Sequence, residues 1–231
     1  MICIIGGAGF VGTRLAQVLD AQGKAFQIFD KALHEGGYCD VTKPDSLAAL
    51  PSADIVINLA AEHRDDVTPR SLYDEVNVEG ARNVCDYCRR SNTRQIIFTS
   101  SVAVYGFAPE GTGEEGAFNP FNDYGRTKME AEAVYRAWQA EDPERRSLVI
   151  VRPTVIFGEQ NRGNVYNLLR QIANGRFIMF GSGKNRKSMA YVQNVAEFLA
   201  FSTQFESGEH LYNYVDKPDL DMNTLIARCR S

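Results

Sequence analysis

A short apolar run followed at once by a glycine-rich turn constrains the fold of this chain more than any other feature. Ile2–Ile5 is apolar throughout, and the residues after it carry a G-x-G-x-x-G spacing at Gly7, Gly9 and Gly12. Glycines at such positions permit a tight turn, let the backbone approach a pyrophosphate, and let the following helix pack closely on the strand. The pyrophosphate would bind free N–H groups at the positive end of that helix. The pattern predicts a dinucleotide-binding unit, against the alternative of an ordinary glycine-rich loop.

Short apolar runs alternate with amphipathic stretches over the first two thirds of the chain. The expected strands are Ile2–Ile5, Ala25–Phe29, Ile55–Leu59, Gln95–Thr99 and Leu148–Val151. The expected helices lie near Val11–Gln22, Ser46–Leu50, Leu72–Arg89 and Tyr124–Ala140. Continuously apolar strands separated by helices are typical of a parallel sheet that is covered on both faces. We therefore predict a doubly wound, Rossmann-like α/β fold with its ligand site at the carboxyl ends of the strands.

The regular alternation weakens after Arg152 and Pro153. One helical stretch, Asn164–Ala173, lies in a segment rich in Gly, Asn and Arg, and a strand and helix return at Met189–Val192 and Val195–Phe201. We expect an NAD-binding domain of residues 1–157 and 188–205. Residues 158–187 and 206–231 are expected to form a small, shortened C-terminal substrate lobe.

The composition is that of an ordinary globular protein. The chain has 231 residues, of which 44% are hydrophobic and 23% charged, with a net charge of -4. Nucleic acid is not an expected partner, because the chain has no basic footprint. No apolar run approaches the roughly 18 residues that span a bilayer, and the N-terminus lacks the basic region of a signal peptide. We expect a cytoplasmic protein without a membrane partner.

The five cysteines do not suggest a metal site. Cys85 and Cys88 form a C-x-x-C, but no second pair stands at metal-ligand spacing. They lie in a stretch of helical character, where an offset of three residues is ordinary packing. We expect a structural role for both rather than a redox or zinc role, and no bound metal.

An acidic residue stands where a dinucleotide fold needs one. Asp30 ends the second expected strand, about 20 residues after the glycine turn, where a carboxylate binds the adenosine ribose diol. Such a carboxylate would repel a 2′-phosphate, so NAD is the expected cofactor rather than NADP. Lys31 and Arg14 are cations that could reach the same phosphate.

Tyr124 and Lys128 form a Y-x-x-x-K pair whose spacing places both side chains on one face of a helix. Tyrosine has an ordinary pKa of about 10, and a nearby ammonium lowers it, which makes the phenol a usable base. The alternative is a core tyrosine beside a surface lysine. Ser101 favours the catalytic interpretation, because a hydroxyl after the fourth strand can bind a substrate oxygen that changes between alcohol and ketone.

These motifs together resemble the extended short-chain dehydrogenase/reductase family, and within it the NAD-dependent epimerase/dehydratase group that acts on nucleotide sugars. The resemblance rests on motifs in family order: Gly6 to Gly12, Asp40-Val41, Asn58 to Ala61, Asn77 to Gly80, Thr99 to Gly106, Tyr124 to Lys128, and Arg152 to Thr154.

The resemblance implies roles for individual residues. The implied catalytic residues are Ser101, Tyr124 and Lys128. The implied cofactor-binding residues are Gly6, Gly9, Phe10, Val11, Gly12, Asp30, Asp40, Val41, Leu59, Ala60, Ala61, Asn77, Thr99, Tyr124, Lys128, Pro153, Thr154 and Val155. The candidate substrate-binding residues are His63, Arg64, Ser101, Asn164, Arg186 and Lys187. For His63 and Arg64 a charged surface loop is the alternative, and for Arg186 and Lys187 a solvated pair.

The resemblance also implies a reaction. Dehydratases of the family carry an Asp-Glu pair after the catalytic hydroxyl, whereas Val102 and Ala103 follow Ser101 here, so dehydration is not expected. C4 epimerisation of a nucleotide sugar is favoured. The alternatives are a 4-keto-sugar reductase, a steroid- or flavonoid-type reductase, and a non-catalytic NAD(P)-binding sensor or scaffold. A homodimer is expected through the helix that carries Tyr124 and Lys128.

Overall fold

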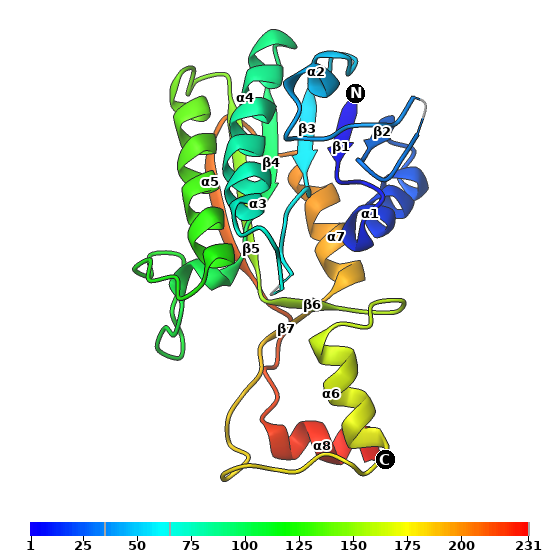
Figure 1. The fold of residues 1–231 in the computed structure, drawn as a ribbon, viewed down its shortest axis with the longest axis vertical. Coiled ribbons are helices and arrows are strands. Elements are labelled where there is room, and N and C mark those ends of the chain that lie inside the picture. Colours follow the sequence, from blue (N-terminus) through cyan, green and yellow to red (C-terminus); the bar gives the residue numbers. More distant parts are fainter. Residues whose placement is uncertain (35, 65, 231) are drawn as a thin grey trace.

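The computed structural model describes residues 1–34, 36–64 and 66–230. Its centre is a parallel sheet with the strand order β2-β1-β3-β4-β5-β8 (Figure 1). These strands are β1 (Ile2–Ile5), β2 (Phe26–Phe29), β3 (Ile55–Asn58), β4 (Gln95–Thr99), β5 (Ser147–Pro153) and β8 (Gly208–Tyr214). The predicted doubly wound, Rossmann-like sheet is confirmed.

Helices cover both faces of this sheet. They are α1 (Phe10–Ala21), α2 (Pro44–Ala48), α3 (Ser71–Tyr73), α4 (Gly80–Arg90), α5 (Asp123–Ala140) and α7 (Val192–Ser202). Successive residues of β1 point to opposite faces. Cys3 and Ile5 join a core with α2, α4 and α5, whereas Ile2 and Ile4 join a second core with α1 and α7. Figure 1 shows the resulting three layers.

The expected helix over Leu72–Arg89 is not regular. A π-helical segment, Asp74–Glu79, lies between α3 and α4. Cys85 and Cys88 are buried on α4, and burial raises the pKa of the Cys85 thiol to about 12. Because metal ligation and redox chemistry need the thiolate, this environment supports the structural role expected for both cysteines.

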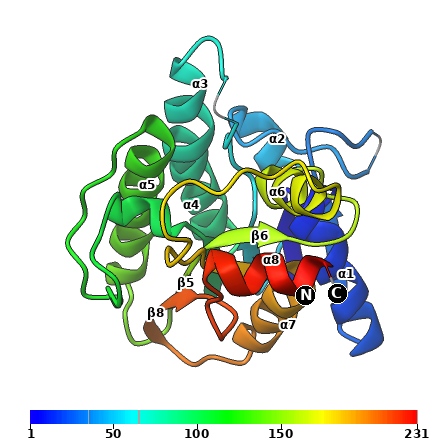
Figure 2. The same cartoon turned by 90° about the horizontal axis from the view of Figure 1, so that it is seen from below.

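A smaller lobe lies beyond the carboxyl ends of the strands (Figures 1 and 2). It comprises β6 (Val155–Phe157) paired in parallel with β7 (Met189–Tyr191), together with α6 (Asn164–Ala173) and α8 (Met222–Arg230). Ile172 of α6 packs against Met222 and Leu225 of α8 in a third apolar cluster.

The expectation that all of residues 206–231 belong to the lobe is wrong for one segment. β8 pairs with β5 from Gly208 to Tyr214 and extends the large sheet. It is an edge strand that is only partly buried, so its sequence mixes polar and apolar residues and lacks the apolar run of an inner strand.

The strand order reverses between β1 and β3, and the backbone approaches itself closely there. Gly6 has a φ of +78°, and a Cβ on it would lie 2.6 Å from the backbone nitrogen of Ala60 after β3. A Cβ on Gly12 would lie 2.5 Å from both Cα and O of Gly7. The reversal point of an open α/β sheet is where ligands bind, so these contacts shape the floor of a site.

Gly12→Ala should destabilise the protein by about 1–3 kcal/mol, because the added methyl group overpacks against backbone that cannot move aside. Gly113→Ala is the matched control, since a Cβ there has no heavy atom within 4 Å. Urea unfolding of both variants measures the difference. Equal stability of the two variants would show that α1 does not need this close contact.

Candidate active site

A cavity of about 1200 Å³ lies at the carboxyl ends of the strands, between the large sheet and the start of the lobe. Its lining contains every predicted cofactor residue except Asn77, and the three predicted catalytic residues. His63, Arg64 and Asn164 line it as well, whereas Arg186 and Lys187 do not. Sequence reasoning did not predict Phe121, Gln160, Asn161 and Arg162, which also line the cavity.

The glycine turn presents the amino end of α1 to this cavity. Gly9 is the N-cap residue of α1 and no side chain caps the helix. The first N–H groups of a helix lack partners within it, so they are free to bind an anion. Thr99 and Thr154 line the same cavity, and their buried hydroxyl oxygens have no hydrogen-bond partner among the residues that the structure describes. Buried polar atoms are rarely left unpaired, so these features fit a polar, phosphate-bearing ligand.

Acidic groups lie at the adenosine end expected from the sequence. The Asp30 carboxylate accepts hydrogen bonds from the backbone N–H of Ala8 at 3.1 Å and of Ala32 at 2.9 Å. It is thereby held beside the glycine turn. The Asp40 carboxylate accepts from the N–H and the hydroxyl of Thr42 at 3.0 and 2.8 Å. Arg14 donates to the Glu159 carbonyl at 3.3 Å, whereas Lys31 lines the cavity.

Tyr124 and Lys128 occupy one face of α5, one turn apart. Lys128 is buried, with its Nζ 4.5 Å from the centre of the Phe98 ring. Burial lowers the pKa of Lys128 to about 7, against the opposing effect of the Glu132 carboxylate. Burial raises the pKa of Tyr124, and a hydrogen bond with Ser101 lowers it in part. The protein surroundings alone therefore do not activate the phenol.

Backbone packing brings Ser101 beside Tyr124. The Ser101 hydroxyl oxygen accepts the N–H of Ala103 at 3.1 Å, which fixes the turn after β4. A Cβ on Gly125 would lie 2.5 Å from the Ala103 carbonyl oxygen, so the first turn of α5 touches that turn directly. Asn122 caps α5 by accepting the N–H of Gly125 at 2.8 Å.

Asn77 is not among the residues that line the cavity, and its expected contact with the cofactor stays a prediction. Its amide oxygen accepts the N–H of Glu62 at 2.9 Å, and its nitrogen donates to the Glu62 carbonyl at 3.0 Å. The same nitrogen donates to the Thr127 hydroxyl at 2.9 Å. Asn77 thus joins the loop after β3 to the helix that carries Tyr124 and Lys128.

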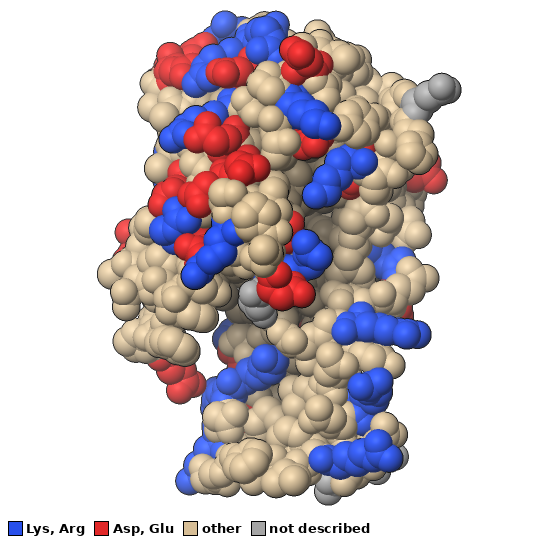
Figure 3. Space-filling view, in the orientation of Figure 1, with Lys and Arg blue, Asp and Glu red and all other residues tan. Residues whose placement is uncertain are grey.

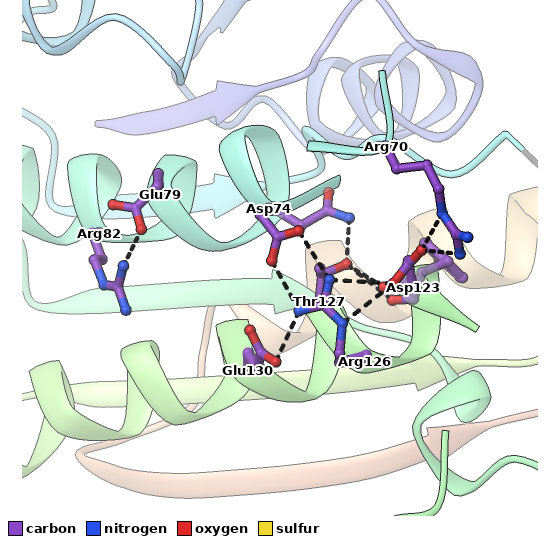
Figure 4. Close-up of polar contacts among 10 residues, drawn as sticks. Arg70, Asp74, Glu79, Arg82, Asp123, Arg126, Thr127 and Glu130 are labelled. Atoms are coloured by element: carbon purple, nitrogen blue, oxygen red, sulfur yellow. Dashed lines mark hydrogen bonds and ion pairs between the residues drawn. The ribbon is translucent and has the colours of Figure 1, made fainter. Parts of the chain in front are cut away.

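Ion pairs on the outer surface join the π-helical segment to α5 (Figure 4). The Arg126 guanidinium binds both carboxylate oxygens of Asp74, at 2.8 and 2.9 Å, and Glu130 at 3.0 Å. Arg70 pairs with Asp123 at the start of α5. Arg126 lowers the pKa of Asp74. These ion pairs join α5 to the π-helical segment and to Arg70 before α3.

A buried ion pair that sequence reasoning missed lies behind the catalytic residues. Glu132 accepts from Arg152 Nε at 2.8 Å and Nη2 at 2.6 Å, and both side chains are almost fully buried. Ser100 donates to the same carboxylate at 2.6 Å. The spacing of Glu132 four residues after Lys128 indicated that the two share a helix face, but no spacing in the sequence pointed to Arg152 as the partner.

The predicted substrate residues are only partly brought together. Arg64 lines the cavity but pairs with Glu62 at 3.2 Å. The backbone of Arg186 forms an isolated antiparallel β-bridge with that of Asp221 in the lobe. The Arg186 guanidinium forms an ion pair with Glu110 at 3.6 Å. A role for Arg186 and Lys187 at a substrate diphosphate stays a prediction.

The sequence model of the NAD dependent epimerase/dehydratase family matches residues 2–214. The chain belongs to this family. It is therefore an NAD-dependent enzyme, and the alternative of a non-catalytic NAD(P)-binding sensor or scaffold is rejected. The glycine turn, Asp30, and the unpaired hydroxyls of Thr99 and Thr154 are the groups that would hold NAD.

Among the similar proteins are several that are named as epimerases. An N-acetyl-alpha-D-glucosaminyl-diphospho-ditrans,octacis-undecaprenol 4-epimerase of Escherichia coli O157:H7 is 50% identical over 236 residues, which cover 98% of this chain and 70% of that protein. A UDP-glucose 4-epimerase of Vibrio cholerae is 31% identical over 218 residues, which cover 86% of this chain and 65% of that one.

Solved structures share the fold. The UDP-N-acetylglucosamine 4-epimerase from Bacillus cereus superposes with a TM-score of 0.85 at 18% identity, over 99% of this chain and 80% of that one. The Thermus thermophilus UDP-glucose 4-epimerase in complex with NAD gives 0.80 at 21% identity, over 99% and 81%.

Lys128→Met should stabilise the cofactor-free protein at pH 7 and lose this advantage as the pH rises. The pKa of Lys128 falls from 10.5 in the unfolded chain to about 7 in the folded protein. Between these pH values the unfolded chain binds more protons than the folded protein, so the free energy of unfolding of the unaltered protein increases as the pH rises. The variant has no such dependence, so the difference between the two proteins shrinks. The gain at pH 7 is on the order of 4 kcal/mol, and it falls below about 1 kcal/mol near pH 10.

Urea unfolding at both pH values measures this difference. Lys184→Met, at an exposed position in the lobe, is the control. A gain that stays the same at both pH values would show that it comes from packing and not from the charge.

NAD should bind at least about tenfold tighter than NADP, a difference of about 1.4 kcal/mol, because Asp30 repels a 2′-phosphate. Asp30→Ala should narrow the gap. Asp30→Asn removes the charge but retains an oxygen that can accept an N–H from the turn. Comparing it with Asp30→Ala therefore distinguishes the effect of the lost charge on cofactor preference from the effect of a disrupted turn. Calorimetric titration with both cofactors decides the matter, and equal affinities in the unaltered protein would refute the role of Asp30.

Proposed function

We propose that this protein epimerises C4 of a sugar carried on a diphosphate, with Ser101, Tyr124 and Lys128 as the catalytic residues. The observation that carries the proposal is the meeting of these three side chains on the wall of the cavity that also contains the glycine turn. A single cavity of about 1200 Å³ offers room for a dinucleotide and a sugar together.

The residues divide the proton chemistry of the reaction among them. Tyr124 removes the proton of the C4 hydroxyl and later returns it to the ketone oxygen. Ser101 donates a hydrogen bond to that oxygen and so stabilises the charge that develops on it. Lys128, on the same face of α5, holds positive charge beside the phenol. NAD supplies the hydride acceptor and donor, and the 4-keto sugar turns its other face before reduction.

Two kinds of carrier fit a diphosphate-linked sugar. The relative at 50% identity is named for an undecaprenol-linked substrate, and the one at 31% identity for a UDP-sugar. The greater identity favours the lipid-linked carrier, and the nucleotide carrier expected from the sequence is the alternative. Net consumption of NADH with a 4-keto sugar would instead identify a reductase.

Location and assembly remain predictions. Within residues 1–34, 36–64 and 66–230, none of the helices combines the length and apolar character needed to cross a membrane. The cytoplasmic location stays an expectation. The homodimer through α5 also stays an expectation, and light scattering of the purified protein would test it.

Tyr124→Phe should keep NAD affinity and reduce epimerisation by about 100-fold or more, because the proton acceptor is lost while the ring remains. Ser101→Ala should cost less, since it removes one hydrogen bond and leaves the base. The assay follows conversion of N-acetylglucosamine to N-acetylgalactosamine on UDP and on undecaprenyl diphosphate by product chromatography. Near-normal turnover of Tyr124→Phe would exclude Tyr124 as the base.

A further inference from the structure

The lobe carries a concentration of positive charge that the rest of the chain lacks. Residues 160–196 contain six basic and no acidic residues, although the chain has a net charge of -4. The basic residues are Arg162, Arg170, Arg176, Lys184, Arg186 and Lys187. In the described part of the chain, only Arg186 of these six forms an ion pair. Figure 3 shows the lobe, at the lower end of the view, with mostly blue side chains, whereas red and blue mix over the sheet domain.

An extended segment after α6 presents two large apolar side chains to solvent. Along residues 177–180 the side chains alternate between the inside and outside of the lobe. Phe177 and Met179 pack against the apolar cluster of α6 and α8. Ile178 and Phe180 point outward, with 70% and 85% of their surface exposed. Alternation places the outer pair on one face of the segment.

A polar recess adjoins this pair in the sequence. Arg170, Gln171, Asn174 and Arg176 line a hollow of about 540 Å³ at the end of α6. Neither arginine has an ion-pair partner among the described residues. Two guanidinium groups and two amides in one recess match the charge and hydrogen-bonding capacity of a phosphate ester.

We propose that this basic apolar surface, formed by Arg170, Arg176, Ile178, Phe180 and Lys184, docks on an anionic phospholipid bilayer. Ile178 and Phe180 enter the interface between headgroups and acyl chains, and the cations bind lipid phosphates. Stable attachment of a protein to a membrane generally takes two signals, one apolar and one electrostatic, and this surface has both.

The positive charge of this surface favours an anionic bilayer over a second copy of the chain as its binding partner. A symmetric dimer through this surface would set the same cations against each other, because a twofold interface pairs a patch with itself. An anionic membrane is complementary to every charged group of the surface. The attachment needs no spanning helix, and it departs from the sequence expectation of no membrane partner.

The inference goes beyond the proposed reaction, and vesicle binding tests it without any substrate. A lipid-carried sugar diphosphate would be met at the same bilayer surface. If the epimerase assay fails, the vesicle-binding result is unaffected. If vesicle binding fails, epimerisation of a sugar carried on a nucleotide is still supported.

The test is co-sedimentation with vesicles of phosphatidylcholine alone and with about one third phosphatidylglycerol. The unaltered protein should sediment with the anionic vesicles, less so as salt is added, and little with the neutral ones. Arg170→Glu with Arg176→Glu should weaken binding by about 30-fold or more, because each basic side chain contributes about 1 kcal/mol at such a surface. Ile178→Ser with Phe180→Ser should weaken it by about tenfold or more.

Matched controls lie on the sheet domain. Phe201→Ser removes an aromatic ring that is 55% exposed on α7, and Arg90→Glu reverses an exposed arginine at the end of α4. Both should bind vesicles as the unaltered protein does. All altered positions lie outside the cavity lining, so NAD affinity and melting temperature should stay unchanged and verify folding.

Three results would overturn the proposal. The first is no binding to anionic vesicles above the neutral control. The second is equal loss of binding in the lobe variants and the sheet-domain controls. The third is an unaltered vesicle affinity of Ile178→Ser with Phe180→Ser together with a lower molar mass by light scattering, which would assign the apolar pair to self-association.

Discussion

The buried ion pair between Glu132 and Arg152 fixes the half of the cavity that carries the proposed catalytic residues Ser101, Tyr124 and Lys128. Glu132 lies on α5 one turn after Lys128, and Arg152 lies near the end of β5. The same carboxylate binds Ser100, directly before Ser101. Removing one partner of a buried pair costs about 3–5 kcal/mol, because the other charge is left without compensation. α5 and the ends of β4 and β5 are therefore kept in one relative position, and the catalytic side chains with them.

Burial sets the electrostatics of this half of the site. It lowers the pKa of Lys128 to about 7, so this lysine is only partly protonated at neutral pH, and it raises the pKa of Tyr124, so the phenol stays neutral in the protein alone. Positive charge near a phenol lowers its pKa. The phenol thus becomes a base only when cation charge is present in the cavity. In the proposed reaction, the positive charge of bound oxidised NAD would lower the pKa of the phenol, so proton removal by Tyr124 would depend on an occupied cofactor site.

Local sequence patterns predicted much of the fold and many of the residues that line the cavity. Inner strands such as β1 and β3 are continuously apolar, because helices cover both of their faces. β8 was not predicted, because this edge strand is partly exposed and its sequence contains both polar and apolar residues. The motif that contains Asn77 is recognisable in the sequence, but its hydrogen bonds to the loop after β3 and to α5 were not predicted. No local pattern specifies such partners.

The sequence by itself determined the glycine turn after β1, the place of Asp30 directly after β2 and the Tyr124–Lys128 pair on one helix face, because each depends on spacing within one or two adjacent elements. Only the tertiary structure decided which distant groups meet. It placed Glu132 against Arg152, brought Gly125 onto the turn that carries Ser101, and left Arg186 outside the cavity. These contacts depend on how helices and strands pack, and packing joins residues whose separation along the chain carries no periodic signal.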